Sequence, residues 1–239
     1  NAGTLVVRTC TVSGNTANTF GGGLMNSSTA SCDYTTIARN SSATGGGARN
    51  TGTLTLRRTL IAENSAASDA DLSGTVTSLG NNLIRIYSGS TVWSSGDLVG
   101  STSDPMRSAL DDLRLNGGTT KTHALLVCSR AIDAAVAIPA LPVDYDQRGQ
   151  TRSANGDHDA VSSPDIGAYE LLAALDNVGP TINAHPMPQV RLDSTGNATI
   201  TTDKLLIGAS DDCGILSTSA SKTSFSCSDV GEITDTLTA

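Results

Sequence analysis

Short runs in which apolar and polar residues alternate recur along the first third of the chain. Leu5 and Val7 are separated by a single residue, as are Leu54 and Leu56. Alternation with a period of two places successive side chains on opposite faces of a β-strand. The runs are only four or five residues long and are bounded by Asn or Gly, which favour turns. The pattern therefore predicts many short strands.

The alternating runs belong to a longer repeat. Asn15, Asn40 and Asn64 lie 25 and 24 residues apart, and the glycine triplets 21–23 and 45–47 lie 24 apart. A unit of this size cannot bury its own apolar face, but stacked units bury their faces against one another. A β-sandwich would not repeat Asn and Gly at constant spacing. The repeat therefore predicts an all-β fold with a right-handed parallel β-helix, and a fourth, looser unit runs from Leu72 to Ile84.

The repeat also sets the register of the coils. Equivalent residues of successive units should stack along the solenoid, either inside it or at its corners. The predicted inward ladders are Val7, Cys32 and Leu56, and Val12, Ile37 and Ile61. The predicted corner stack is Asn15, Asn40 and Asn64, because Asn tolerates left-handed backbone and bonds along such a stack.

Composition narrows the class of protein. The net charge is −8 and the isoelectric point is near 4.7, which disfavours nucleic acid as a partner because that surface needs dense positive charge. No stretch approaches the length and apolarity of a membrane span. Charged residues make up only 16% of the chain, which argues against a self-repelling disordered coil.

An ordered set of motifs follows the repeat. These are 115–126 (LNGGTTKTHALL), 131–134 (AIDA), 146–149 (DQRG) and 165–170 (DIGAYE). Together with the repeat, the set resembles the choice-of-anchor Q domain of large secreted bacterial proteins, and the coils resemble the β-helical repeats related to polymorphic outer-membrane proteins. The resemblance covers residues 1–172 and implies the last coils of a β-helix with the region that closes it.

The chain changes character after this region. Residues 173–180 are expected to be a linker, and residues 181–239 alternate as sandwich strands do. The pattern around Cys213 and Cys227 resembles the hyalin-repeat module, an immunoglobulin-like sandwich, and we expect the module to be incomplete in residues 181–239. That resemblance implies a Cys213–Cys227 disulfide and hence an oxidising compartment.

Candidate catalytic groups are sparse in the coils. Glycoside hydrolysis needs two opposed carboxylates, whereas the three clear coils hold only Asp33 and Glu63, at non-equivalent positions. His123 has no nucleophile at a recognisable spacing, so no catalytic triad is expected. We therefore expect no catalytic residues, no enzyme activity and no cofactor-binding residues in this segment.

Two local segments invite specific interpretations. In residues 155–159 (NGDHD), Asp157 and Asp159 have the alternate spacing of calcium ligands, but the other features of an EF-hand are missing. A polar turn is favoured there, and a structural Ca²⁺ bound by these two carboxylates is the alternative. Residues 104–113 carry helix-start signals and predict one or two helical turns.

These observations favour a structural and adhesive segment of a large extracellular bacterial surface protein, such as a stalk, fibre or adhesin. One alternative is the non-catalytic C-terminal part of a β-helical polysaccharide lyase or hydrolase. A second is a building block of an extracellular filament or surface layer. The expected partners are other domains of the same long chain, cell-surface or secretion components, glycans and neighbouring surface proteins.

Overall fold

A computed structural model describes most of the chain. The described residues are 1–136, 144–152, 154–156, 161–172, 181–186, 188–210, 218–231, 233 and 235–238. The chain divides into two compact units, Asn1–Leu175 and Asp176–Ala239. The division falls inside the segment expected to be a linker, and each unit is described by itself.

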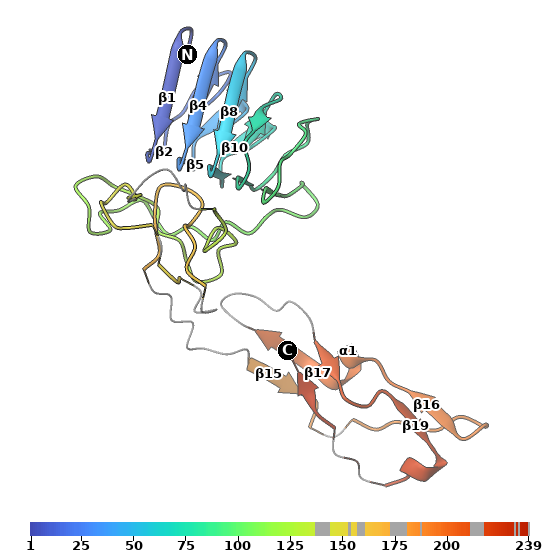
Figure 1. The fold of residues 1–239 in the computed structure, drawn as a ribbon. Helices are drawn as coiled ribbons and strands as arrows, with labels where there is room; N and C mark the ends of the chain where they lie inside the picture. The colour runs from blue at the N-terminus through green and yellow to red at the C-terminus, as the bar shows by residue number, and fades with distance from the viewer. Residues whose placement is uncertain are drawn as a thin grey trace. The chain divides into compact units, whose positions relative to one another are not determined.

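The first unit is built on a parallel β-solenoid of about three turns (Figure 1). Four parallel sheets run along it, each made from equivalent strands of successive coils. The first sheet contains β1 (Thr4–Arg8), β4 (Thr29–Asp33), β8 (Thr53–Arg57) and β12 (Thr77–Ser78). The second contains β2 (Thr11–Ser13), β5 (Thr36–Ala38), β9 (Leu60–Ala62), β13 (Leu83–Ile84) and β14 (Leu98–Val99). The smaller sheets are β3 (Leu24–Asn26), β7 (Ala48–Asn50) and β11 (Leu72–Ser73), and β6 (Ser41–Thr44) with β10 (Ser65–Ser68).

The predicted inward ladder is confirmed. Val12 pairs with Ile37, and Ile37 pairs with Ile61, in adjacent parallel strands. Ile37 and Ile61 are almost fully buried, whereas Val12 is only partly buried because it lies in the first coil. The second ladder of Val7, Cys32 and Leu56 is also in register. The spacing of the repeat therefore identified both the fold and the side chains that fill its interior.

The predicted asparagine stack is confirmed, but its backbone reason is wrong. The amide nitrogen of Asn15 donates to Oδ1 of Asn40 at 3.0 Å, and that of Asn40 donates to Oδ1 of Asn64 at 3.0 Å. The left-handed residues are the ones immediately before them: Gly14, Arg39 and Glu63. With the turn made one residue earlier, each Asn amide donates to the carbonyl two residues before it.

The glycine triplets lie where the backbone of the neighbouring coil leaves no room for a side chain. A Cβ atom at Gly22 would lie 2.5 Å from the carbonyl oxygen of Gly46, and one at Gly46 would lie 2.3 Å from that of Ser65. Backbone cannot yield to such contacts without separating the coils. Glycine is therefore required here by stacking, and the repeat explains the triplets.

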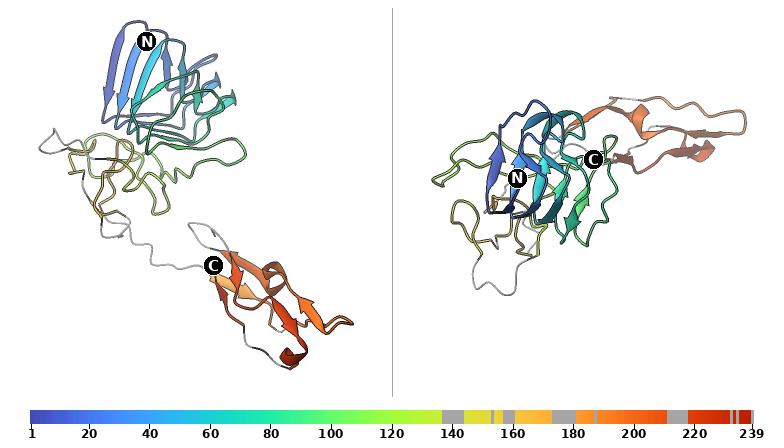
Figure 2. Two further views of the ribbon diagram at one scale, coloured as in Figure 1. Left: turned by 45° about the vertical axis from the view of Figure 1, so that its right-hand side comes forward. Right: turned by 90° about the horizontal axis from the view of Figure 1, so that it is seen from above.

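A closing region after the last coil covers the outer face of the second sheet (Figures 1 and 2). Leu110, Leu125 and Ile166 pack against Ala38 and Leu60, whose side chains point away from the solenoid interior. Strands β5 and β9 are consequently buried on both faces. The first unit thus has two apolar cores, one inside the coils and one between the coils and the closing region.

The predicted helix at residues 104–113 does not form. Leu110 makes an antiparallel bridge with Leu125 instead. The carboxylate of Glu63 accepts hydrogen bonds from the Ser108 hydroxyl at 3.0 Å and from the Leu110 amide at 3.3 Å. These tertiary contacts hold the segment in an irregular path against the coils and outweigh its local preference for a helix.

The described part of the second unit is mostly antiparallel β-structure. Strand β15 (Thr181–Ala184) pairs with β17 (Leu206–Ser210), β16 (Asn197–Thr199) with β19 (Ser224–Ser226), and β18 (Ser219–Ala220) with β20 (Leu237–Thr238). Two short helices, α1 (Thr202–Leu205) and η1 (Cys227–Asp229), adjoin these strands.

The predicted Cys213–Cys227 disulfide is not formed. Cys227 is a free, exposed thiol whose sulfur lies 3.7 Å from the carbonyl oxygen of Gly196, and Cys213 lies outside the described residues. Cys227 begins the short helix η1, where the turn points its side chain to solvent. The argument for an oxidising compartment that relied on this bond is therefore removed.

Candidate functional site

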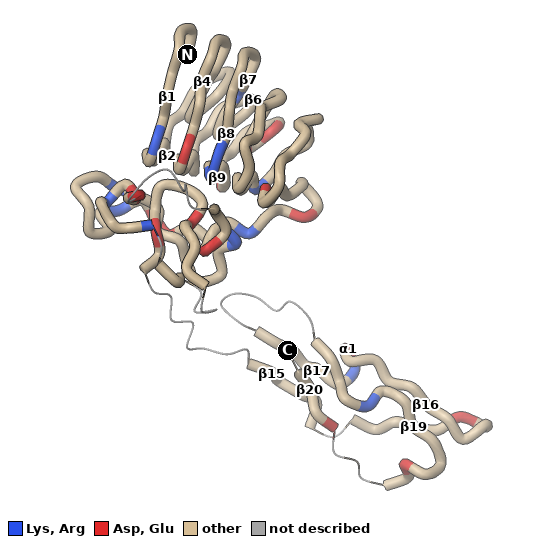
Figure 3. Tube along the Cα trace, in the orientation of Figure 1, with Lys and Arg blue, Asp and Glu red and all other residues tan. Residues whose placement is uncertain are grey.

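Opposite charges alternate at the ends of the strands of the first sheet (Figure 3). Asp33 lies between Arg8 of the preceding coil and Arg57 of the following coil, at 3.6 Å and 2.8 Å. The parallel register places these three side chains in one column. The two flanking guanidinium groups therefore compensate the negative charge of the Asp33 carboxylate.

Arg58 completes the set of charges around Asp33 from a buried position. Its guanidinium makes hydrogen bonds of 2.8 to 3.0 Å to both carboxylate oxygens of Asp33. It also stacks on the Tyr34 ring at 4.1 Å, and Arg152 of the closing region lies 3.9 Å from the same ring centre. Burial raises the pKa of the Tyr34 hydroxyl to about 12, despite the nearby arginines. Tyr34 is therefore a neutral ring held between two cations.

The other carboxylates of the coils also serve the structure. Glu63 accepts a hydrogen bond from Nε of Arg39 at 3.0 Å, besides those from the closing region. Asp71 ends the asparagine stack by accepting from the backbone and side chain of Asn64, and burial raises the pKa of its carboxyl. Glu63 and Asp71 are thus committed to separate structural contacts, as is Asp33.

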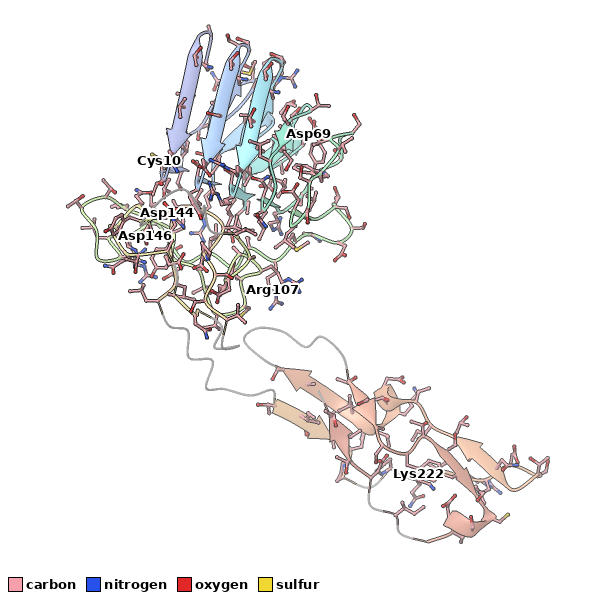
Figure 4. All side chains as sticks on the ribbon, in the orientation of Figure 1. Cys10, Asp69, Arg107, Asp144, Asp146 and Lys222 are labelled. Carbon is pink, nitrogen blue, oxygen red and sulfur yellow. The ribbon has the colours of Figure 1, made fainter. Side chains whose placement is uncertain are left out.

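The motif at residues 146–149 forms a buried ion pair in the closing region; Figure 4 labels Asp146, its acidic member. Oδ2 of Asp146 lies 2.7 Å from Nε of Arg148 and accepts a hydrogen bond from the Glu170 amide at 3.0 Å. The Arg148 guanidinium stacks on the Tyr169 ring at 3.6 Å. The two motifs that begin at Asp146 and Asp165 are therefore two halves of one cluster.

Two further carboxyls of this cluster are buried beside each other. Asp165 accepts from the amides of Asp133 and Leu171, and Glu170 accepts from those of Ala154 and Asp165. Burial raises the pKa of Asp165 to about 8 and that of Glu170 to about 7, and their mutual repulsion adds to the shift at Asp165. The pair therefore titrates near neutral pH.

The same motifs fasten the closing region to the coils. The Ala168 amide donates to the Thr36 hydroxyl at 2.9 Å, and the Gly167 amide donates to the Arg58 carbonyl at 3.0 Å. Gly167 has φ +104°, and a Cβ there would lie 2.7 Å from the Thr36 hydroxyl. The geometry thus gives the motif 165–170 a structural role.

A serine and a histidine meet at the corner of the first coil. The Ser13 hydroxyl oxygen lies 2.7 Å from Nε2 of His123, and Nδ1 of His123 lies 2.7 Å from the carbonyl oxygen of Asp111. The two residues are 110 positions apart, so no local motif relates them. No nucleophile lies at a recognisable sequence spacing from His123, but the fold brings the Ser13 hydroxyl to its ring. The sequence indicates only that Ser13 occupies an outward position of a predicted strand and that His123 belongs to the motif at residues 115–126.

Charged groups surround this histidine. Arg39 donates to Oε2 of Glu63 at 3.0 Å and to Oδ1 of Asp112 at 2.5 Å. Burial lowers the pKa of His123, and the positive charge of Arg39 acts in the same direction. The imidazole is therefore neutral at neutral pH.

The described residues hold no cluster of metal ligands, and their free thiols differ in exposure. Asp157 and Asp159 lie outside the described residues; within the described part, no group of three or more His, Cys, Asp or Glu is placed to hold a metal ion. Cys32 is a buried free thiol, as expected, whereas Cys10 is free and exposed. No helix among the described residues is long and apolar enough to cross a membrane.

No protein-family model matches the chain, and neither a curated protein nor a solved structure matches it. The class of fold that the structure defines is a parallel β-solenoid. The resemblances to choice-of-anchor Q and hyalin-repeat modules remain expectations based on the sequence.

Proposed function

We propose that this chain is a structural and adhesive segment of a large extracellular bacterial surface protein. The observation that carries the proposal is the continuous stack of coils, in which equivalent residues bond from one coil to the next. Such a solenoid gives an elongated, regular surface in which each coil supports its neighbours.

The state of the coil carboxylates favours this function over polysaccharide cleavage. Asp33 is bound by three arginines, Glu63 is bonded to Arg39 and the closing region, and Asp71 is buried at the end of the asparagine stack. A glycosidase needs one carboxyl that donates a proton and one that acts as a base or nucleophile across a sugar ring. These three acids are occupied at separate corners, which supports the absence of glycoside cleavage.

In this proposal, the second unit is an immunoglobulin-like module of the hyalin-repeat type that extends the stalk. Its antiparallel pairs of short strands are compatible with part of a sandwich. The extracellular location depends on the sequence resemblance alone, because Cys227 is free. The alternatives are a subunit of an extracellular filament and the non-catalytic C-terminal part of a polysaccharide-degrading enzyme.

The test uses the purified chain with immobilised pectins, alginates and host glycans, with and without Ca²⁺. Retention without release of reducing ends or unsaturated products is the expected result. Release of such products would overturn the structural proposal in favour of catalysis. An antibody raised against the coils should label intact cells of the source organism, and labelling only after lysis would contradict a surface location.

A further inference from the structure

We propose that Ser13 is a nucleophile activated by His123 and that it reacts with carboxylic esters. This activity goes beyond the structural function and departs from the expectation that the segment has no enzyme chemistry. The observation behind it is the chain of short contacts from the Ser13 hydroxyl through both nitrogens of His123 to the Asp111 carbonyl. A nucleophile, a base and a group that orients the base are the three parts of an activated serine.

The contacts fix where the protons lie. The Asp111 carbonyl oxygen can only accept a hydrogen bond, so Nδ1 of His123 carries a proton. In the neutral ring, Nε2 is then the acceptor, and the Ser13 hydroxyl donates to it at 2.7 Å. This tautomer is the one in which histidine can remove a proton from the serine.

Ser13 can be approached from solvent, whereas the histidine behind it cannot. Ser13 is partly buried, and its neighbours Gly14 and Asn15 are exposed. Gly14 has φ +71°, and no atom lies within 4 Å of the place where its side chain would begin. His123 is only 1% exposed. Water therefore does not compete for Nε2, while the space beside Gly14, the residue after the serine, is open.

The charges around the ring keep it in the reactive form. The groups that act on His123 are Arg39, Glu63 and Asp112, besides the Asp111 carbonyl. Arg39 is paired with both Glu63 and Asp112, so these charges largely offset one another. Burial is then the dominant influence, and it favours the neutral base.

The proposed step is an acyl transfer. The Ser13 oxygen attacks the ester carbonyl carbon while its proton moves to Nε2 of His123. The tetrahedral adduct collapses, the C–O bond to the alcohol breaks, and the imidazolium returns the proton to the departing oxygen. Water, activated by the same nitrogen, then hydrolyses the acyl-serine and releases a carboxylic acid.

The neighbouring hydroxyl provides a matched control. Thr11 lies on the same face of β2, but its hydroxyl donates to Oε1 of Gln147 at 2.7 Å rather than to a base. Ser13 and Thr11 therefore share strand, face and contact with the closing region. They differ in the partner that could activate the oxygen.

The experiment treats the full chain with p-nitrophenyl acetate and follows acetylation by peptide mass spectrometry. Ser13 should be acetylated first, Ser13→Ala should abolish that modification, and Thr11→Val should leave it unchanged. His123→Gln should slow acetylation by at least about 100-fold, because general-base assistance contributes about 10²–10⁴. Acetylation spread over many serines, or a rate unaffected by His123→Gln, would overturn the proposal.

A second variant covers the case in which His123→Gln fails to fold. Ser13→Cys places a thiol beside the imidazole, and the exposed Cys10 serves as an internal reference thiol. If Nε2 acts as a base, the introduced thiol should react with iodoacetamide at pH 6 about ten-fold faster than Cys10, because a nearby base favours the thiolate. Equal rates would show that the pair is only a structural contact.

Discussion

Replacing Asn40 by alanine removes the central member of the asparagine stack and should destabilise the whole first unit. The Asn40 side chain donates to the carbonyls of Val12 and Ala38 and to Oδ1 of Asn64, at 2.9 to 3.1 Å. Its Oδ1 accepts from both the backbone and the side chain of Asn15. Asn40 is 1% exposed, so water cannot easily replace these contacts.

The magnitude follows from these contacts. Five hydrogen bonds at about 0.5–1.5 kcal/mol each give an expected loss of about 3–5 kcal/mol in the free energy of unfolding. Asn15→Ala is the matched control, because Asn15 occupies the same corner in the first coil. It is exposed and its side chain makes two hydrogen bonds, so its loss should cost less than about 1 kcal/mol.

Urea unfolding followed by tryptophan fluorescence is the appropriate assay. The single tryptophan, Trp93, packs against the inner core of the first unit and lies edge-on to Tyr87 at 5.2 Å. Its signal therefore reports the first unit without interference from the second. Equal losses of stability in Asn40→Ala and Asn15→Ala would refute the reasoning that the buried stack holds the coils together.

Three further outcomes are expected. Arg58→Ala should destabilise the first unit by about 3–5 kcal/mol because it leaves the buried Asp33 carboxylate without its buried guanidinium partner. The more exposed Arg57→Ala should cost less than about 1 kcal/mol in the same urea assay. The pKa of Asp165 is about 8 in the folded protein against 3.8 ordinarily, so folding takes up a proton between these values and stability should fall as the pH rises through this window. Asp165→Asn should flatten that dependence, and a stability that rises over the same pH range would contradict it. In the folded chain, iodoacetamide should modify Cys10 but spare Cys32, whose burial raises its thiol pKa to about 12; equal modification would show that the coils open readily.

The solenoid could be predicted from the sequence because each coil repeats the same local signals. Val12, Ile37 and Ile61 were placed in one ladder from spacing alone, and their strands pair in that register. A second asparagine stack has the same signal in the sequence. Asn26 donates to Oδ1 of Asn50 at 2.8 Å, and these residues are 24 positions apart like the others.

The closing region was harder to predict because its contacts are not periodic. Residues 60–62 (LIA) form a continuous apolar run, and such a run signals a strand that is buried on both faces. The run therefore indicates that another segment of the chain covers the outer face of the second sheet. It could not indicate which later segment does so, because Leu110 and Ile166 reach it through loops without a repeating pattern.

The meeting of Ser13 with His123 illustrates the same limit and shows why the closing region matters for function. The coils alone supply a serine on an outward strand, and the closing region alone supplies a histidine whose tautomer is set by the Asp111 carbonyl. Neither part has the pair, so any chemistry at this corner depends on correct docking of one onto the other. The Gly167 and Ala168 amides help to fix that docking through Arg58 and Thr36. The motif 165–170 therefore influences the Ser13–His123 pair indirectly, because it helps to dock the closing region on the coils. It contributes no reacting atom.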